Sequence, residues 1–150
     1  RACIVGASYG GYAALAGVTL QQGLYKCAVA VAPVSDIRDM YQQDYRASGR
    51  DKTTRFALRR QLGQPDSWDA VSPLLSAAKA DAPILLIHGR DDTVVPYSHS
   101  TKMADKLKDA GKPYQFVTLD EEDHWLSLSE TRQTMLKASV EFVQKHNPAD

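Results

Sequence analysis

Four short apolar runs constrain the fold of this chain of 150 residues more than any other feature. Each run is about as long as one β-strand, and the first three show no alternation of apolar and polar residues. Unbroken apolar strands are typical of a parallel sheet that is covered on both faces. The sequence therefore predicts a buried sheet, with strands in ACIVG at 2–6, KCAVAVAP at 26–33, APILLIHG at 82–89 and PYQFVTL at 113–119.

Helical patterns follow the first, third and fourth runs, at 11–23, 98–112 and 128–147. Gly23 and Gly111 are well placed to end the first two helices, and Ser129 to cap the last. Residues 34–80 form a polar excursion, with a helix expected in TTRFALRRQLG and a turn and short helix or loop after it. Strands that alternate with helices predict an α/β sheet with right-handed crossovers.

The charge composition gives no support to a nucleic-acid or membrane partner. Eighteen basic side chains balance eighteen acidic ones, which favours neither nucleic acid nor an anionic membrane. No apolar run approaches the ~18 residues of a membrane span. Cys3 and Cys27 lack metal-ligand spacing, and no metal or cofactor is implied. Both lie in apolar runs, so we expect buried free thiols; a disulfide is possible if their strands are neighbours, but less favoured.

The segment Gly6-Ala7-Ser8-Tyr9-Gly10 fits the G-x-S-x-G nucleophile elbow, and it lies between a predicted strand and a predicted helix. In such an elbow a strained backbone projects the serine hydroxyl from the sheet, and the following helix N-terminus supplies positive potential. The backbone N–H of Tyr9 is the expected oxyanion donor. Two alternatives are a glycine-rich turn that only packs tightly and a phosphate-binding turn.

Two later motifs supply the remaining groups of a catalytic triad. Asp92 lies in HGRDDTVVP after the third strand, and His124 lies in DEEDHW after the fourth. Parallel strands present their carboxyl ends at one edge of the sheet, where open α/β folds place their sites. The order Ser, Asp, His is that of an α/β-hydrolase. We expect Ser8 as nucleophile, His124 as general base and acid, and Asp92 as the group that orients His124.

Other residues compete for these roles. Asp91 is the rival to Asp92 as the acid. Of the remaining histidines, we expect His88 to be structural, His99 to be a surface or capping residue, and His146 to lie in the tail. We expect the acidic run Asp120–Asp123 to be a solvated loop.

The sequence resembles the C-terminal part of a serine peptidase of the prolyl oligopeptidase family, in particular its acylaminoacyl-peptidase and dipeptidyl-peptidase branches. The resemblance is carried by GASYGGYAAL, AVAPVSDIRDMY, the SP of WDAVSPLL, PILLIHGRDDTVVPYSHS and EEDHWLSLSETR. It implies that residues 1–150 form the C-terminal half of an α/β-hydrolase catalytic domain, with about four mostly parallel strands and flanking helices. The earlier strands and any β-propeller are expected to lie outside this chain.

The resemblance also assigns residues. The acid falls on Asp92 and the histidine on His124. The pocket for the residue before the scissile bond falls on Val34, Ile37 and Met40, with Tyr9 as another wall. These aliphatic and thioether side chains favour a broad apolar pocket over strict proline preference. The alternative is that Val34 and Ile37 only pack the excursion.

Three functions follow as expectations. The first is a serine peptidase that cleaves short peptides or acyl-peptides through an acyl-enzyme, without a cofactor. The second is a carboxylesterase of the same fold. The third is an inactive half-domain whose open sheet edge associates with a second copy or with the missing N-terminal half. The compartment stays open, with the cytoplasm favoured.

Overall fold

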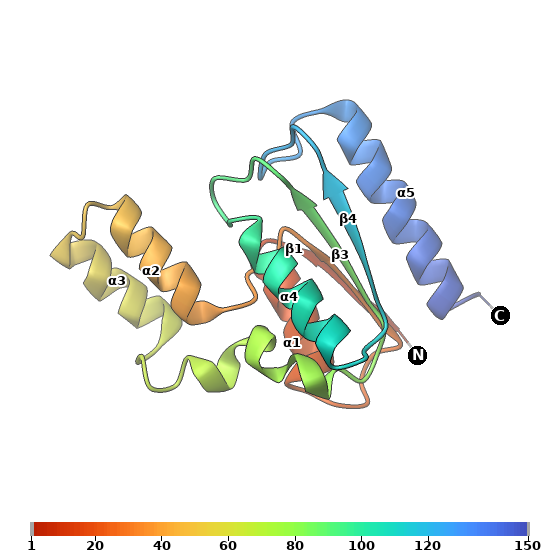
Figure 1. Cartoon of the computed structure of the whole chain (residues 1–150), viewed down its shortest axis with the longest axis horizontal. Helices are drawn as coiled ribbons and strands as arrows, with labels where there is room; N and C mark the ends of the chain where they lie inside the picture. The colour runs from red at the N-terminus through yellow and green to blue at the C-terminus, as the bar shows by residue number, and fades with distance from the viewer. Residues whose placement is uncertain (1, 150) are drawn as a thin grey trace.

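The computed structural model describes residues 2–149 and contains a four-stranded sheet between helices (Figure 1). The strands lie in the order β1-β2-β3-β4, and every neighbouring pair is parallel. The α/β fold expected from the sequence is therefore confirmed. The strands are β1 (Cys3–Ala7), β2 (Cys27–Val31), β3 (Ile84–Gly89) and β4 (Tyr114–Leu119).

Helices cover both faces of the sheet (Figure 1). On one face, α1 (Tyr9–Thr19) and α4 (Ser98–Asp109) pack against alternate residues of the central strands, such as Ile84 and Leu86. On the other face, α5 (Ser129–His146) packs Phe142 against the intervening residues, such as Leu85. Because both faces are buried, the central strands need an apolar residue at nearly every position. This requirement explains the unbroken runs of the sequence.

The excursion between β2 and β3 forms a helical hairpin of α2 (Ile37–Ala47) and α3 (Lys52–Leu62). It projects from the body of the sheet (Figure 1), and the 3₁₀ turns η1 (Asp69–Val71) and η2 (Pro73–Lys79) lead back to β3. The helix expected in this region is present as α3. The sequence did not indicate α2, which begins where the Asp36 side chain accepts the backbone N–H groups of Arg38 and Asp39.

Two predicted helix ends are wrong. The first helix, α1, ends at Thr19, so Gly23 lies beyond its cap and forms part of the following turn. Ser129 is the first residue of α5, and the preceding Leu128 provides no side-chain cap. Gly111 follows the cap of α4 in a left-handed conformation, as expected of a glycine at that position.

Cys3 and Cys27 form a disulfide, so the expectation of two free thiols is wrong. They are direct partners in the parallel pairing of β1 with β2, and their Cα atoms lie 4.6 Å apart, within disulfide reach. The bond cross-links the edge strand to the centre of the sheet.

The β1 edge of the sheet is open. Within residues 2–149, β1 pairs only with β2, and the Val5 side chain is 57% exposed. An unpaired strand edge presents N–H and C=O groups to another strand. In the same part of the chain, no helix combines the length and apolar character that crossing a bilayer requires.

Candidate active site

Ser8 lies at the sharp turn between β1 and α1. Its backbone has φ 57° and ψ −118°, a strained conformation for a residue with a side chain. The Ser8 N–H donates to the Val31 carbonyl of β2 at 2.8 Å, which fixes the turn to the sheet. Gly6 is required for this geometry, because a Cβ there would collide with the Gly10 backbone. The turn thus directs the Ser8 side chain away from the strands, at the N-terminus of α1.

Asp92 lies in the turn after β3, and its side chain is fully buried. Its Oδ1 accepts the backbone N–H groups of Val94 at 2.9 Å and Val95 at 2.8 Å. Burial alone would raise the pKa of Asp92, but hydrogen bonds from His88, His124 and Val95 lower it to about 2. Asp92 is therefore an ionised carboxylate at neutral pH, although water does not reach it.

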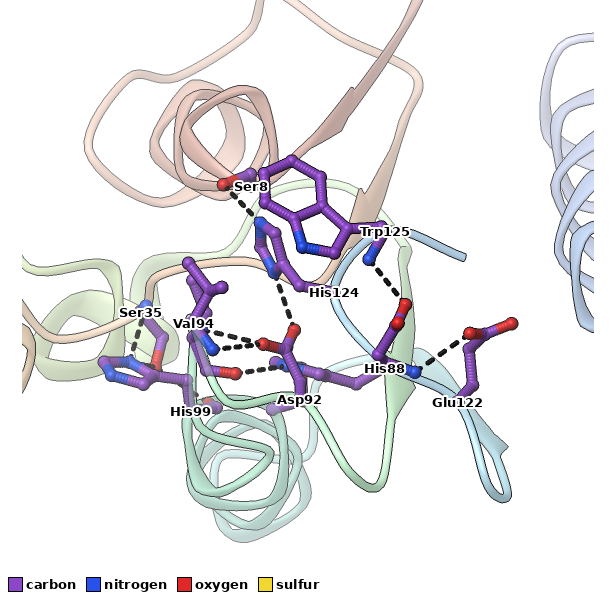
Figure 2. A network of polar contacts seen from close by, with 12 residues as sticks. Ser8, Ser35, His88, Asp92, Val94, His99, Glu122, His124 and Trp125 are labelled. Atoms are coloured by element: carbon purple, nitrogen blue, oxygen red, sulfur yellow. Dashed lines mark hydrogen bonds and ion pairs between the residues drawn. The ribbon is translucent and has the colours of Figure 1, made fainter. Parts of the chain in front are cut away.

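His124 follows β4 and bridges the other two groups (Figure 2). Its Nδ1 lies 2.7 Å from Asp92 Oδ2, and its Nε2 lies 3.0 Å from Ser8 Oγ. Because the carboxylate can only accept, Nδ1 carries a proton and donates to Asp92. In the neutral ring Nε2 is then free to accept the Ser8 hydroxyl proton. The three predicted side chains thus lie in one hydrogen-bonded chain at the carboxyl edge of the sheet.

The loop that carries His124 is organised around Glu122, which is fully buried. The expectation that Asp120–Asp123 is a solvated loop is therefore wrong at this residue. Glu122 accepts backbone N–H groups at both ends of the loop and the hydroxyl of Thr131 in the first turn of α5. Burial raises the pKa of Glu122, but the bonds from Thr131 and from backbone N–H groups outweigh it and hold the pKa below its usual value. Most hydrogen-bond donors to this carboxylate are backbone N–H groups, so the pattern of side chains in the sequence does not predict its burial.

The loops of Asp92 and His124 meet at Gly89. A Cβ on Gly89 would collide with the Glu122 carbonyl, so only glycine permits this approach. The Asp91 N–H donates to the same carbonyl at 3.1 Å, while the Asp91 side chain is exposed. Asp91 therefore joins the two loops through its backbone, and Asp92 is the carboxylate that contacts His124.

The remaining histidines lie away from Ser8. His88 is fully buried and contacts the same Asp92 oxygen as His124. His99 is also buried, so the surface role expected for it is wrong; its Nδ1 accepts the Ser35 N–H at 3.1 Å. His146 packs its ring on Phe142 at the end of α5.

A cavity of about 280 Å³ opens beside Ser8. All four predicted pocket residues line it: Tyr9, Val34, Ile37 and Met40. The sequence did not single out the other lining residues, which are Tyr12, Gln61, Leu62, Val71, Val94 and Val95. Val94 and Val95 belong to the Asp92 motif and could have been inferred from it. The contribution of α3 depends on how the hairpin folds back and left no local signal.

Among residues 2–149, no group of three or more histidine, cysteine, aspartate or glutamate side chains is arranged to hold a metal ion.

Comparison with known proteins gives the lineage. The profile of the prolyl oligopeptidase family matches residues 1–148. The chain belongs to this family. Within the family, it is 31% identical to cattle (Bos taurus) dipeptidyl peptidase 4 over 97% of its length, and it spans 18% of that protein. It is 33% identical to human prolyl endopeptidase FAP over 85% of its length, and it spans 16% of that relative.

Two solved peptidase structures have the same fold. A puromycin-hydrolyzing peptidase of Mycobacterium tuberculosis superposes with a TM-score of 0.84 at 28% identity, over 97% of this chain and 22% of that one. An acylaminoacyl peptidase in complex with Z-Gly-Gly-Phe-chloromethyl ketone superposes with a TM-score of 0.74 at 28% identity, over 92% of this chain and 22% of that one. The α/β-hydrolase fold of this prolyl oligopeptidase-family chain is therefore established.

Proposed function

We propose that this chain carries the reacting groups of a serine peptidase that hydrolyses short peptides or acyl-peptides. One observation carries the proposal: His124 lies 3.0 Å from Ser8 Oγ through Nε2 and 2.7 Å from Asp92 through Nδ1. The chain spans less than a fifth of the curated relatives named above, so the activity is proposed for the whole protein. Residues 1–150 would be the second half of its α/β-hydrolase catalytic domain.

The proposed reaction proceeds by acyl transfer. Ser8 Oγ attacks the scissile carbonyl carbon, and His124 Nε2 takes the hydroxyl proton. Asp92 stabilises the imidazolium, and the Tyr9 N–H at the start of α1 donates to the oxyanion. The C–N bond then breaks, and His124 returns the proton to the leaving amine. Water, deprotonated by the same His124, hydrolyses the Ser8 ester and frees the enzyme.

The cavity beside Ser8 suggests which acyl groups fit. Tyr9, Val34, Ile37 and Met40 would hold the side chain that precedes the scissile bond. Aliphatic and thioether walls adapt to several shapes, which favours a broad range of apolar residues. The phenylalanine reagent bound to the related acylaminoacyl peptidase supports this assignment, because phenylalanine is large and apolar.

A labelling experiment tests the nucleophile. We expect a fluorophosphonate probe to label the full-length protein at Ser8, identified by peptide mass spectrometry, and Ser8→Ala to abolish labelling. No labelling of a folded protein would contradict the proposal.

The kcat/KM values for an aminoacyl anilide and a short-chain ester then distinguish a peptidase from an esterase. Strong ester turnover without anilide turnover would assign a carboxylesterase instead.

We also propose that another strand covers the open β1 edge, from the remainder of the protein or from a second copy. The exposed Val5 and the unpaired backbone edge support this. Sedimentation of the 150-residue chain at tens of micromolar tests it. Self-association is expected, and a well-folded monomer would overturn the second-copy form. If the chain is monomeric, it should instead form a stable complex with the co-expressed upstream segment, which would support a covering strand from the remainder of the protein. Absence of that complex would exclude this alternative as well.

A further inference from the structure

The hydrogen-bonded chain at the sheet edge continues beyond Asp92. His88 Nε2 lies 3.2 Å from the same Oδ2 that contacts His124, and His88 Nδ1 lies 2.7 Å from Ser100 Oγ. His88 and Ser100 are both fully buried. Five side chains therefore form one continuous series of polar contacts, from Ser8 through His124, Asp92 and His88 to Ser100, and Figure 2 shows His88 and His124 close to Asp92.

The partners of His88 fix its protonation. Its Nε2 lies 2.9 Å from the Val95 carbonyl as well as close to the Asp92 carboxylate. Both groups only accept, so Nε2 carries the proton. In the neutral ring, Nδ1 accepts the hydroxyl proton of Ser100. His88 Nε2 thus donates to the Val95 carbonyl, in the turn that carries Asp92, and its N–H also lies beside the carboxylate Oδ2.

These contacts surround the Asp92 carboxylate. Oδ1 accepts two backbone N–H groups, from Val94 and Val95, while Oδ2 accepts from His124 and lies 3.2 Å from His88 Nε2. Each carboxylate oxygen thus has two polar neighbours. Rotation of the Asp92 side chain would break several charge-assisted hydrogen bonds at once. The plane of the carboxylate, and with it the orientation of the His124 ring, is thereby fixed.

The need for an apolar strand does not explain His88. It follows four buried aliphatic residues in β3, Ile84 to Ile87. An imidazole in such a strand costs free energy unless both nitrogens are paired, and here both are paired toward the reacting groups or their support.

We propose that His88 is a positioning residue that holds Asp92, and that Ser100 holds His88 in turn. The inference rests on the proposed peptidase function, in which Asp92 orients the catalytic base. It predicts that the Asp92 end of the imidazole matters more for acyl transfer than the Ser100 end.

Two amides separate the ends of the ring. In His88→Gln the side-chain amide reaches the Nε2 position and can donate to Asp92, whereas in His88→Asn it reaches only the Nδ1 position beside Ser100. We expect fluorophosphonate labelling of the full-length protein to slow by about 10- to 100-fold in His88→Asn, the size of a lost hydrogen bond to a charged group. In His88→Gln the loss should stay below about threefold.

A spectroscopic readout distinguishes positioning from stability. The proton between His124 Nδ1 and Asp92 should give a low-field ¹H NMR resonance in wild type and His88→Gln that is shifted or lost in His88→Asn. A purely structural role predicts equal slowing in both variants and an unchanged resonance, and that result would overturn the proposal, as would wild-type rates in His88→Asn. Failure of wild type to be labelled would reject the peptidase function instead, and the resonance, which needs no turnover, would still test the positioning.

Discussion

The two walls of the candidate active site are built differently. On one side, the loops after β3 and β4 hold Asp92 and Glu122 buried, each accepting hydrogen bonds on both carboxylate oxygens. On the other side, the α2–α3 hairpin lines the pocket, yet each of its helices buries one side chain, Ile37 and Leu58. The groups proposed to react thus lie in a saturated polar network, and the pocket wall lies on an element with little core of its own.

This difference separates two properties of the site. Reacting groups need fixed geometry, which dense hydrogen bonding provides. A pocket wall needs shape, which can change without disturbing that geometry. Substitutions at the loops should therefore alter rates for all substrates, whereas substitutions in the hairpin should alter discrimination between substrates.

The largest effect is expected at Asp92. Asp92→Asn keeps the size of the side chain but removes the charge, and the amide favours the wrong tautomer of His124. We expect kcat/KM of the full-length protein to fall by about 10⁴-fold for all substrates. The matched control is Asp91→Asn, whose exposed carboxylate should be replaceable without loss. Equal losses in the two variants would contradict the assignment of the acid.

Sequence patterns were sufficient to predict that Ser8, Asp92 and His124 lie together, because each follows an apolar strand and parallel strands share one carboxyl edge. They were insufficient for the Cys3–Cys27 bond, which depends on the register of β1 against β2. Apolar runs specify that two strands are buried, but the register comes from packing of the whole sheet.

The burial of Glu122 shows the same limit. Four acidic residues in a row favour solvent on composition alone. The backbone folds around one of them, with left-handed conformations at Glu121 and Leu126. The contribution of Gln61 and Leu62 to the pocket likewise requires α3 to fold back beside the pocket residues of α2. Local patterns carry no information about such non-local contacts.

The next largest effect concerns the loop of His124. Glu122→Gln keeps the shape but replaces a charged acceptor by a neutral one, so we expect the free energy of unfolding to fall by about 2 kcal/mol. Glu121→Gln is the matched control, since this neighbour is exposed and should change stability by less than about 0.5 kcal/mol. Denaturant titration measures both. A change no larger than the control would show that the buried carboxylate does not hold the loop.

The pH dependence of stability should follow the same residue. In the folded protein the pKa of Glu122 lies below the ordinary value of a glutamate, so its stabilisation is complete above the ordinary pKa and is lost as pH falls through the folded pKa. Stability of the Glu122→Gln variant should therefore decline less steeply below pH 4.5 than that of wild type. An identical acid profile for the two proteins would contradict the role of this ionisation.

A smaller effect, confined to discrimination, is expected in the pocket. Met40→Ala removes a wall contact, so we expect the preference for a large over a small apolar residue before the scissile bond to change by about tenfold. The fluorophosphonate labelling rate should stay within about twofold of wild type, because Met40 does not touch the reacting groups. Met135→Ala on α5 controls for loss of a partly buried methionine outside the pocket. A fall in the labelling rate without a change in preference would show that Met40 supports the reacting groups, as the loops after β3 and β4 do, and does not select the substrate.

The smallest effect tests whether the α2–α3 hairpin contributes to the hydrophobic core. Phe56 on α3 is 65% exposed, whereas Phe142 on α5 is 3% exposed and packs against the sheet. Phe56→Ser should change the free energy of unfolding by less than about 0.5 kcal/mol and leave kcat/KM unaltered. Phe142→Ser should cost several kcal/mol, as expected for a lost core aromatic. If Phe56→Ser proved equally costly in the full-length protein, another part of that protein would have to cover α3. The hairpin would then be a buried element, and the pocket wall would be as constrained as the loops opposite.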